Sequence, residues 1–136
     1  MTENYDVIVV GGGPAGIFAA LELSQAAKLR VLLLEKGKDI SGRRCPVRDT
    51  GSSCVECKPC NLVCGLGGAG AFSDGKLVLS SQVGGHMGEY LGEERADKLI
   101  KYVDELYLKF GATKKVFGGD GRIDEISRNA KKAECD

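Results

Sequence analysis

The sequence has no tryptophan, a single histidine and only three prolines, and it has no excess of charge of either sign. Its 19 lysine and arginine residues balance 19 aspartate and glutamate residues. A chain without net charge has no general attraction to nucleic acid or to an anionic membrane, so neither is expected as a partner. No apolar run reaches the roughly 18 residues that a membrane span needs.

Glycine and cysteine are abundant in this sequence, and the lack of a recognisable export signal bears on the chemistry expected of the cysteines. The apolar residues 7–10 follow Asp6 and precede glycines, which predicts a buried strand and not a signal peptide. A cytoplasmic location is therefore expected, where metal binding or redox chemistry is favoured over a disulfide framework for the six cysteines. The excess among the 20 glycines clusters at Gly11–Gly16 and Gly65–Gly75, which is typical of backbone that approaches a ligand closely.

The first 36 residues have the pattern of a strand, a helix and a second strand. Residues 5–10 form a β-branched run typical of a strand buried on both faces of a parallel sheet. A helix is predicted from about Pro14 to Ala27, where proline is tolerated in the first turn. Residues 30–35 predict the second buried strand, parallel to the first. The fold class is therefore α/β, a Rossmann-like βαβ unit over 4–36 with a parallel sheet that is incomplete in this chain.

The remaining residues divide into three segments, and the length of the chain predicts one domain. A Cys- and Gly-rich loop is expected over 37–75, ordered by a function or a cofactor because so long a loop is uncommon inside a domain. A short strand at 76–80 and a helix at 93–110 are predicted next; Gly111 would end that helix. The tail, 111–136, is expected to hold one more short helix from Asp124 to about Lys132.

A glycine pattern joins the first strand to the helix. Gly11-x-Gly13-x-x-Gly16 follows a predicted strand and opens a predicted helix, and Glu35 ends the next strand. In a dinucleotide site the first glycine permits the tight turn, the second admits the pyrophosphate, and the third allows close packing of helix and strand. Glu35 would bind the ribose diol and repel a 2′-phosphate, which disfavours NADP here. Lys36 lies either beside the adenosine or in solvent.

Two stretches resemble a known family. Asp6-Val-Ile-Val-Val-Gly-Gly-Gly-Pro-Ala-Gly16 is similar to the amino-terminal FAD fingerprint of the two-dinucleotide-binding-domain flavoproteins. Cys60-Asn-Leu-Val-Cys-Gly-Leu-Gly-Gly-Ala-Gly-Ala-Phe-Ser-Asp-Gly-Lys76 resembles a signature of the FAD-dependent dehydrogenases, a family of NAD(P)/FAD-dependent oxidoreductases. The resemblance extends over about residues 4–117.

The resemblance implies an FAD-dependent oxidoreductase that acts on an undefined small molecule, with NAD(P)H as a candidate electron partner. It implies that the first glycine turn and Glu35 bind the ADP moiety, and that Arg43 or Arg44 and the second glycine segment approach the pyrophosphate or the flavin. The alternative for the arginines is plain surface charge, and the alternative for the second glycine segment is a plain turn. The candidate cofactor-binding residues are Gly11, Gly12, Gly13, Pro14, Ala15, Gly16, Glu35, Lys36, Arg44, Gly67, Gly68, Ala69 and Gly70.

Family members are several times longer than this chain. We therefore expect residues 1–136 to be an N-terminal portion whose remaining FAD domain and substrate domain belong to a C-terminal region of the same protein. The 136 residues alone are not expected to be active.

Four cysteines have the spacing of a bacterial ferredoxin run, Cys54-x-x-Cys57-x-x-Cys60-x-x-x-Cys64. Cys45, which precedes a proline, competes with Cys64 as the fourth ligand. An iron–sulfur cluster, a structural zinc and free or redox-active thiols beside a flavin all stay open. Cys135 stands apart and is interpreted as a plain cysteine.

No catalytic residue is assigned from the sequence. His86 is interpreted as a surface loop residue, and a turn explains Asp74 and Lys76 nearly as well as a place near a flavin. The alternatives to a flavin oxidoreductase are a cysteine-loop metal or electron-relay module and a truncated, non-functional fragment.

Overall fold

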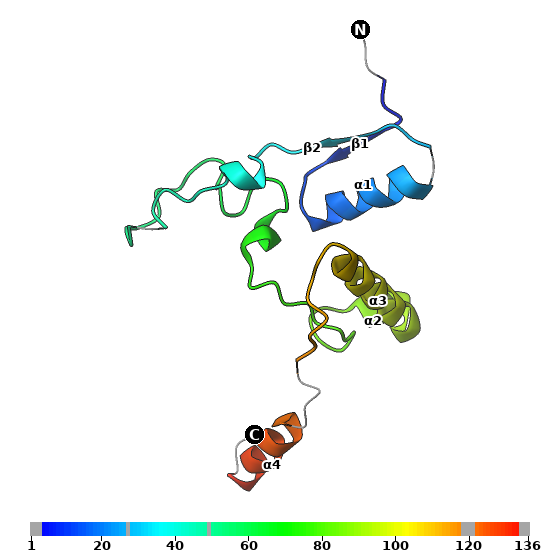
Figure 1. Cartoon of the computed structure of the whole chain (residues 1–136), viewed down its shortest axis with the longest axis vertical. Coiled ribbons are helices and arrows are strands. Elements are labelled where there is room, and N and C mark those ends of the chain that lie inside the picture. The colour runs from blue at the N-terminus through cyan, green and yellow to red at the C-terminus, as the bar shows by residue number, and fades with distance from the viewer. Residues whose placement is uncertain (1–3, 27, 49, 118–121, 134–136) are drawn as a thin grey trace. The chain divides into compact units, whose positions relative to one another are not determined.

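The computed structural model describes residues 4–26, 28–48, 50–117 and 122–133 (Figure 1). The chain divides into two compact units, Met1–Lys76 and Leu77–Asp136, where its length predicted a single domain. The elements of the first unit are β1 (Val7–Val10), α1 (Pro14–Ala26), β2 (Val31–Leu34) and the 3-10 turns η1 (Ile40–Gly42) and η2 (Ala69–Phe72). The second unit holds α2 (Met87–Leu91), α3 (Glu93–Lys109) and α4 (Arg122–Lys132).

The first unit contains the predicted βαβ unit. β1 and β2 pair in parallel, with Val7 opposite Val31 and Val10 opposite Leu34. The carbonyl of Gly13 accepts the first helical hydrogen bond from the N–H of Ile17 at 2.9 Å, so α1 begins directly after the glycine turn. α1 packs along the strand pair (Figure 1). The prediction of two parallel strands joined by a helix is confirmed.

The sequence predicted that both faces of the strand pair are buried. For the part of the chain that the structure describes, this prediction is wrong. The sheet has two strands, and the side chains of Ile8 and Val10 are 57% and 82% exposed. A β-branched run predicts a sheet with layers on both faces, but the described residues provide one helix for one face. The apolar sequence of β1 therefore exceeds the burial that these residues supply.

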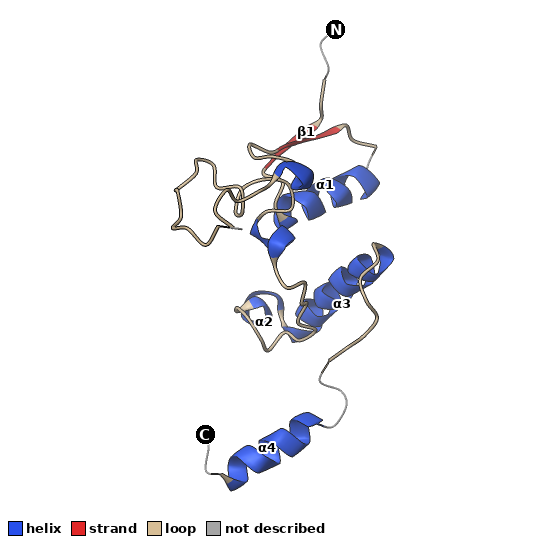
Figure 2. Ribbon diagram, turned by 60° about the vertical axis from the view of Figure 1, so that its left-hand side comes forward, coloured by secondary structure: helices blue, strands red, loops and turns tan. Residues whose placement is uncertain are grey.

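The loop over 37–75 is ordered by contacts within the first unit. Figure 2 shows it as a long tan segment interrupted by short helical turns. Its beginning and its returning part lie side by side, since the N–H of Leu66 donates to the carbonyl of Lys38 at 3.1 Å. The carbonyl of Cys60 also accepts from the N–H of Cys64 at 2.8 Å. The loop thus folds back on the strand pair and returns to the glycine turn.

The second unit is helical. α3 covers the predicted range 93–110 except for Phe110, which is its C-cap, and Gly111, at φ +98°, follows the helix as predicted. The N–H of Ala112 reaches the carbonyl of Tyr107 at 3.0 Å and that of Gly111 reaches Leu108 at 3.2 Å, which is the Schellman pattern. α4 agrees with the helix expected in the tail.

Two further expectations fall on this part of the chain. The strand predicted at 76–80 is wrong: these residues have no regular secondary structure, and the described sheet contains β1 and β2 only. The apolar face of α3 is present, yet only Ala96 on it is fully buried, and Leu99 is 41% exposed. None of the helices that the structure describes has the length and hydropathy needed to cross a bilayer.

Candidate nucleotide-binding site

Glu35 links the end of β2 to the glycine turn after β1. Its Oε2 accepts a hydrogen bond from the N–H of Gly12 at 2.6 Å, and its Oε1 accepts one from the N–H of Gly37 at 2.7 Å. A carboxylate has about four lone-pair positions, so these hydrogen bonds leave it able to accept a further donor. The parallel pairing of β1 and β2 brings these residues together from 23 positions apart.

The hydrogen bonds to Glu35 favour its charged form. The N–H groups of Gly12 and then Gly37 lower the pKa of this carboxyl, partial desolvation opposes them, and Gly65 and Lys36 add smaller lowering effects. A carboxylate that stays ionised is an acceptor only, as recognition of a ribose diol requires. Lys36 itself is exposed.

The three glycines of the predicted turn occupy different surroundings. A Cβ on Gly16 would collide with the carbonyl oxygen of Gly11, and Gly11 itself adopts a φ of +106°. A Cβ on Gly13 meets no atom within 4 Å. The fold therefore requires glycine at Gly16 and Gly11, whereas at Gly13 it leaves open space beside the helix N-terminus. This is the place where a pyrophosphate approaches in a dinucleotide site.

The second glycine segment lies against the first. The N–H of Gly67 donates to the carbonyl of Gly12 at 2.7 Å. A Cβ on Gly68 would lie 3.2 Å from the Cα of Gly13 and 3.3 Å from the Cδ of Pro14. Gly68, at φ +61°, is the residue before η2, which includes Ala69 and Gly70. The structure thus brings the two predicted glycine groups to one place.

The two candidate arginines differ in their surroundings. Arg43 is 3% exposed, and its guanidinium donates to backbone carbonyls within the loop. Arg44 is exposed, and its side chain has no hydrogen-bond or ionic partner among the described residues. It lines an open cavity of about 490 Å³ together with Arg43, Cys45, Pro46, Arg48 and Leu62. Arg44 is therefore the arginine available to a ligand.

The five cysteines that the structure describes do not form a preassembled site. In the ranges that the structure describes, no three histidine, cysteine, aspartate or glutamate side chains are grouped as metal ligands. Cys45, Cys54, Cys57, Cys60 and Cys64 are free thiols, and Cys54 is exposed. Cys135 lies outside the described residues. A metal site here would have to assemble when the ion binds, so the metal stays a prediction.

The ferredoxin spacing makes a prediction that metal analysis checks. We expect protein purified without oxygen to contain iron and acid-labile sulfide, and Cys57→Ser to lose both, because one ligand of the run is removed. Cys135→Ser is the matched control and should keep them. Zinc in their place would support a structural thiolate site, and the absence of both metals would leave the free-thiol hypothesis.

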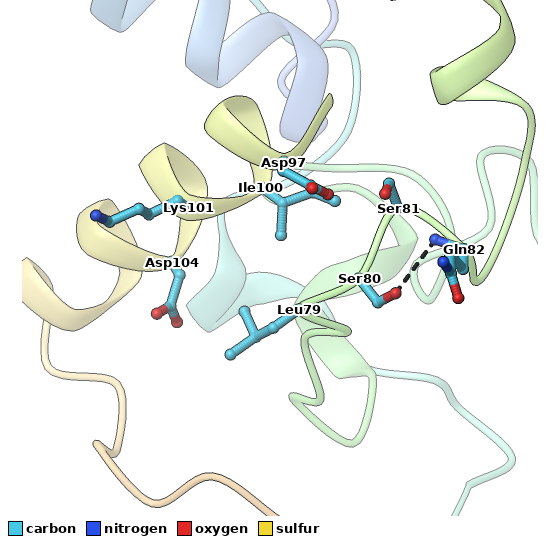
Figure 3. Close-up of a pocket in the computed structure, with 8 residues that line it drawn as sticks. All are labelled: Leu79, Ser80, Ser81, Gln82, Asp97, Ile100, Lys101 and Asp104. Atoms are coloured by element: carbon cyan, nitrogen blue, oxygen red, sulfur yellow. Dashed lines mark hydrogen bonds between the residues drawn. The ribbon is translucent and has the colours of Figure 1, made fainter. Parts of the chain in front are cut away.

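A separate cavity of about 340 Å³ lies in the second unit (Figure 3). Residues of α3 line one side and the segment from Leu79 to Gln82 lines the other. The hydroxyl of Ser80 accepts from the N–H of Gln82 at 3.2 Å. The charged side chains that line the cavity are Lys101, Asp97 and Asp104. Because both signs are present, the lining does not favour a ligand of one particular charge.

Sequence reasoning missed Gly37 and Gly65 as parts of the site. A Cβ on Gly37 would lie 2.5 Å from the nitrogen of Gly65, and a Cβ on Gly65 would meet Lys38 and Arg43. Because they have no side chain, these glycines allow the returning part of the loop to pass directly beside Glu35. The excess of glycine from Gly65 onward was the signal, but the partner segment is not evident from the sequence.

The model of the pyridine nucleotide-disulphide oxidoreductase family matches residues 5–104. An uncharacterized protein of Clostridium beijerinckii is 31% identical over 155 aligned positions, covering 95% of this chain and 29% of that protein. A putative FAD-dependent oxidoreductase, LodB, of Marinomonas mediterranea is 60% identical over 35 residues, or 26% of this chain and 10% of the relative.

The mitochondrial electron transfer flavoprotein-ubiquinone oxidoreductase of Caenorhabditis elegans is 49% identical over 46 residues, which are 30% of this chain and 8% of that protein. This chain therefore spans less than a third of the length of each of these relatives. No solved structure matches the chain.

Proposed function

Because the chain belongs to the pyridine nucleotide-disulphide oxidoreductase family, we propose that it is the nucleotide-binding part of an FAD-dependent oxidoreductase and binds the ADP half of FAD. The βαβ unit is the Rossmann-type beginning of such a domain. The names of the relatives from Marinomonas mediterranea and Caenorhabditis elegans, one an FAD-dependent oxidoreductase and the other a flavoprotein oxidoreductase, favour FAD.

The observation that carries this proposal is the contact between Glu35 and the glycine turn. The hydrogen bond from Gly12 to Glu35 places an ionised carboxylate beside the turn that precedes α1. A ribose diol on the free lone pairs of Glu35 would put the attached phosphates toward Gly13 and the first turn of α1. The first N–H groups of a helix have no partner within it, and they favour an anion.

Within this proposal each part of the chain has one task. Glu35 binds the ribose, the open face of Gly13 admits the pyrophosphate, and the second glycine turn covers the first. The flavin, when bound, accepts and returns the electrons, and the protein supplies binding and orientation. The proposal also includes an undefined small molecule as substrate and NAD(P)H as electron partner. A further region of the same protein would complete the fold.

Glu35→Ala tests the ribose contact. We expect the dissociation constant for FAD to rise roughly ten- to hundred-fold, because the ribose hydroxyls lose a charged acceptor. Titration of the protein with FAD, followed by flavin fluorescence, measures this. Glu125→Ala on α4 is the matched control, since it removes an exposed carboxylate outside the βαβ unit. An unchanged affinity in Glu35→Ala would show that the nucleotide binds elsewhere.

The pH dependence of the unfolding free energy distinguishes an effect of the charge of Glu35 from an effect of its size. Since its pKa is lowered in the folded protein, its charged form stabilises the fold fully above the pKa of the unfolded chain. That stabilisation disappears as the pH falls through the lowered value. The difference in unfolding free energy between wild type and Glu35→Gln should therefore be constant near neutral pH and shrink in acid. A difference that does not change with pH would contradict the charged role.

A further inference from the structure

Arg43 binds backbone and not a carboxylate. Its Nε donates to the carbonyl of Asn61 at 3.0 Å, Nη2 to that of Leu62 at 2.6 Å and Nη1 to that of Leu66 at 2.7 Å. The guanidinium also lies 4.8 Å from the centre of the Phe72 ring. No aspartate or glutamate of the described chain pairs with it, although its side chain is almost fully buried. A buried guanidinium without an acidic partner is tolerated only if its N–H groups have hydrogen-bond acceptors.

One of these bonds reaches the nucleotide turn through a single peptide group. The carbonyl of Leu66 and the N–H of Gly67 belong to the same planar peptide. Arg43 holds the carbonyl end, and the N–H end donates to the carbonyl of Gly12 at 2.7 Å. The orientation of this peptide plane therefore decides whether the second glycine turn can bind the first.

The other bonds hold the same segment in place. Asn61 donates from its side-chain amide to the carbonyl of Arg44 at 2.9 Å, so the residue after Arg43 is also tied to the returning part of the loop. Gly65 leaves the room that the arginine occupies, because a Cβ there would lie 2.6 Å from the Cδ of Arg43. Three carbonyls bound by the Nε and both Nη atoms of one side chain suit a guanidinium, since an ammonium group is a compact charge without that fork of donors.

We propose that Arg43 is a positioning residue that fixes the Leu66–Gly67 peptide plane and thereby holds the second glycine turn on the first. This inference rests on the proposed function for its consequence, which is that FAD affinity depends on Arg43 without contact between them. Arg44, the exposed neighbour, is then the arginine that meets the anionic ligand directly. The two adjacent arginines have separate tasks.

Arg43→Gln and Arg43→Lys test the clamp in the nucleotide-free protein. We expect the amide hydrogen of Gly67 to exchange at least roughly tenfold faster in both variants, and the thiol of Cys64 to be alkylated faster, because neither side chain satisfies three carbonyls. Arg44→Gln is the matched control, in which both rates should stay at the wild-type value. Unchanged exchange at Gly67 in the Arg43 variants would overturn the inference.

FAD titration of the same variants tests the consequence. We expect Arg43→Lys to bind FAD roughly tenfold or more weakly although it keeps the positive charge, and Arg44→Gln to weaken binding without any change at Gly67. Faster exchange at Gly67 with unchanged FAD affinity would overturn the positioning role. If the wild type binds no FAD, the proposed function fails, while the exchange measurement still tests the clamp.

Chemical rescue keeps the test valid if a variant folds poorly. In Arg43→Ala, methylguanidinium should occupy the vacated space and restore slow exchange at Gly67, whereas methylammonium should not. The circular dichroism of the helices reports folding in the same samples. Equal effects of the two cations would show that charge alone matters, and this would contradict a role for the fork.

Discussion

In the full-length protein, Gly13→Val is expected to abolish retention of FAD and leave the fold intact. The fold tolerates the side chain because a Cβ at this position meets no atom within 4 Å. The same open space is where the proposal places the pyrophosphate, so a branched side chain excludes it. The residue before a helix also contributes to capping, and valine there should cost about 1 kcal/mol of stability. Flavin absorbance per mole of purified protein measures the loss of cofactor.

The control for this prediction is the thermal unfolding of the same variant, which should stay cooperative and close to that of the wild type. Gly42→Ala serves as a matched glycine substitution away from the site, since its Cβ would make ordinary contacts at 3.5 Å or more. It should keep both flavin and stability. Undiminished flavin in Gly13→Val would show that the pyrophosphate does not lie over this turn.

Gly16→Ala is expected to have the opposite result, a loss of the fold itself. The added methyl group would collide with the carbonyl oxygen of Gly11, which is backbone and has no alternative rotamer. Relief requires α1 to move away from β1, and we expect this to cost about 3 kcal/mol or more of unfolding free energy. Urea unfolding followed by circular dichroism measures this cost.

The comparison of the two glycines is itself the sharpest test of the turn. They lie three residues apart in one motif, yet one is required by the packing of the helix and the other by the ligand. If Gly16→Ala unfolds at the same urea concentration as the wild type, the approach of α1 to the turn is looser than described. If FAD protects Gly13→Val from unfolding, the assignment of the ligand face is wrong.

The sequence by itself determined the local elements of this protein. The apolar runs of the two strands, the glycine turn, the proline that opens α1 and the glycine that ends α3 are short-range signals, each dictated by local backbone preference. Glu35 was recognised as well, because its distance from the glycine turn reflects the length of one helix and one strand.

Tertiary structure alone decided how the loop returns to the turn. Nothing in the local pattern distinguishes Arg43 from Arg44, and the sequence assigned either of them to the ligand. Arg43 is buried because three carbonyls from residues 18 to 23 positions away converge on it. The spacing of Cys54, Cys57, Cys60 and Cys64 likewise predicted a ligand set, yet their side chains are not grouped. Contacts between distant segments depend on the path of the whole chain, which no short-range preference encodes.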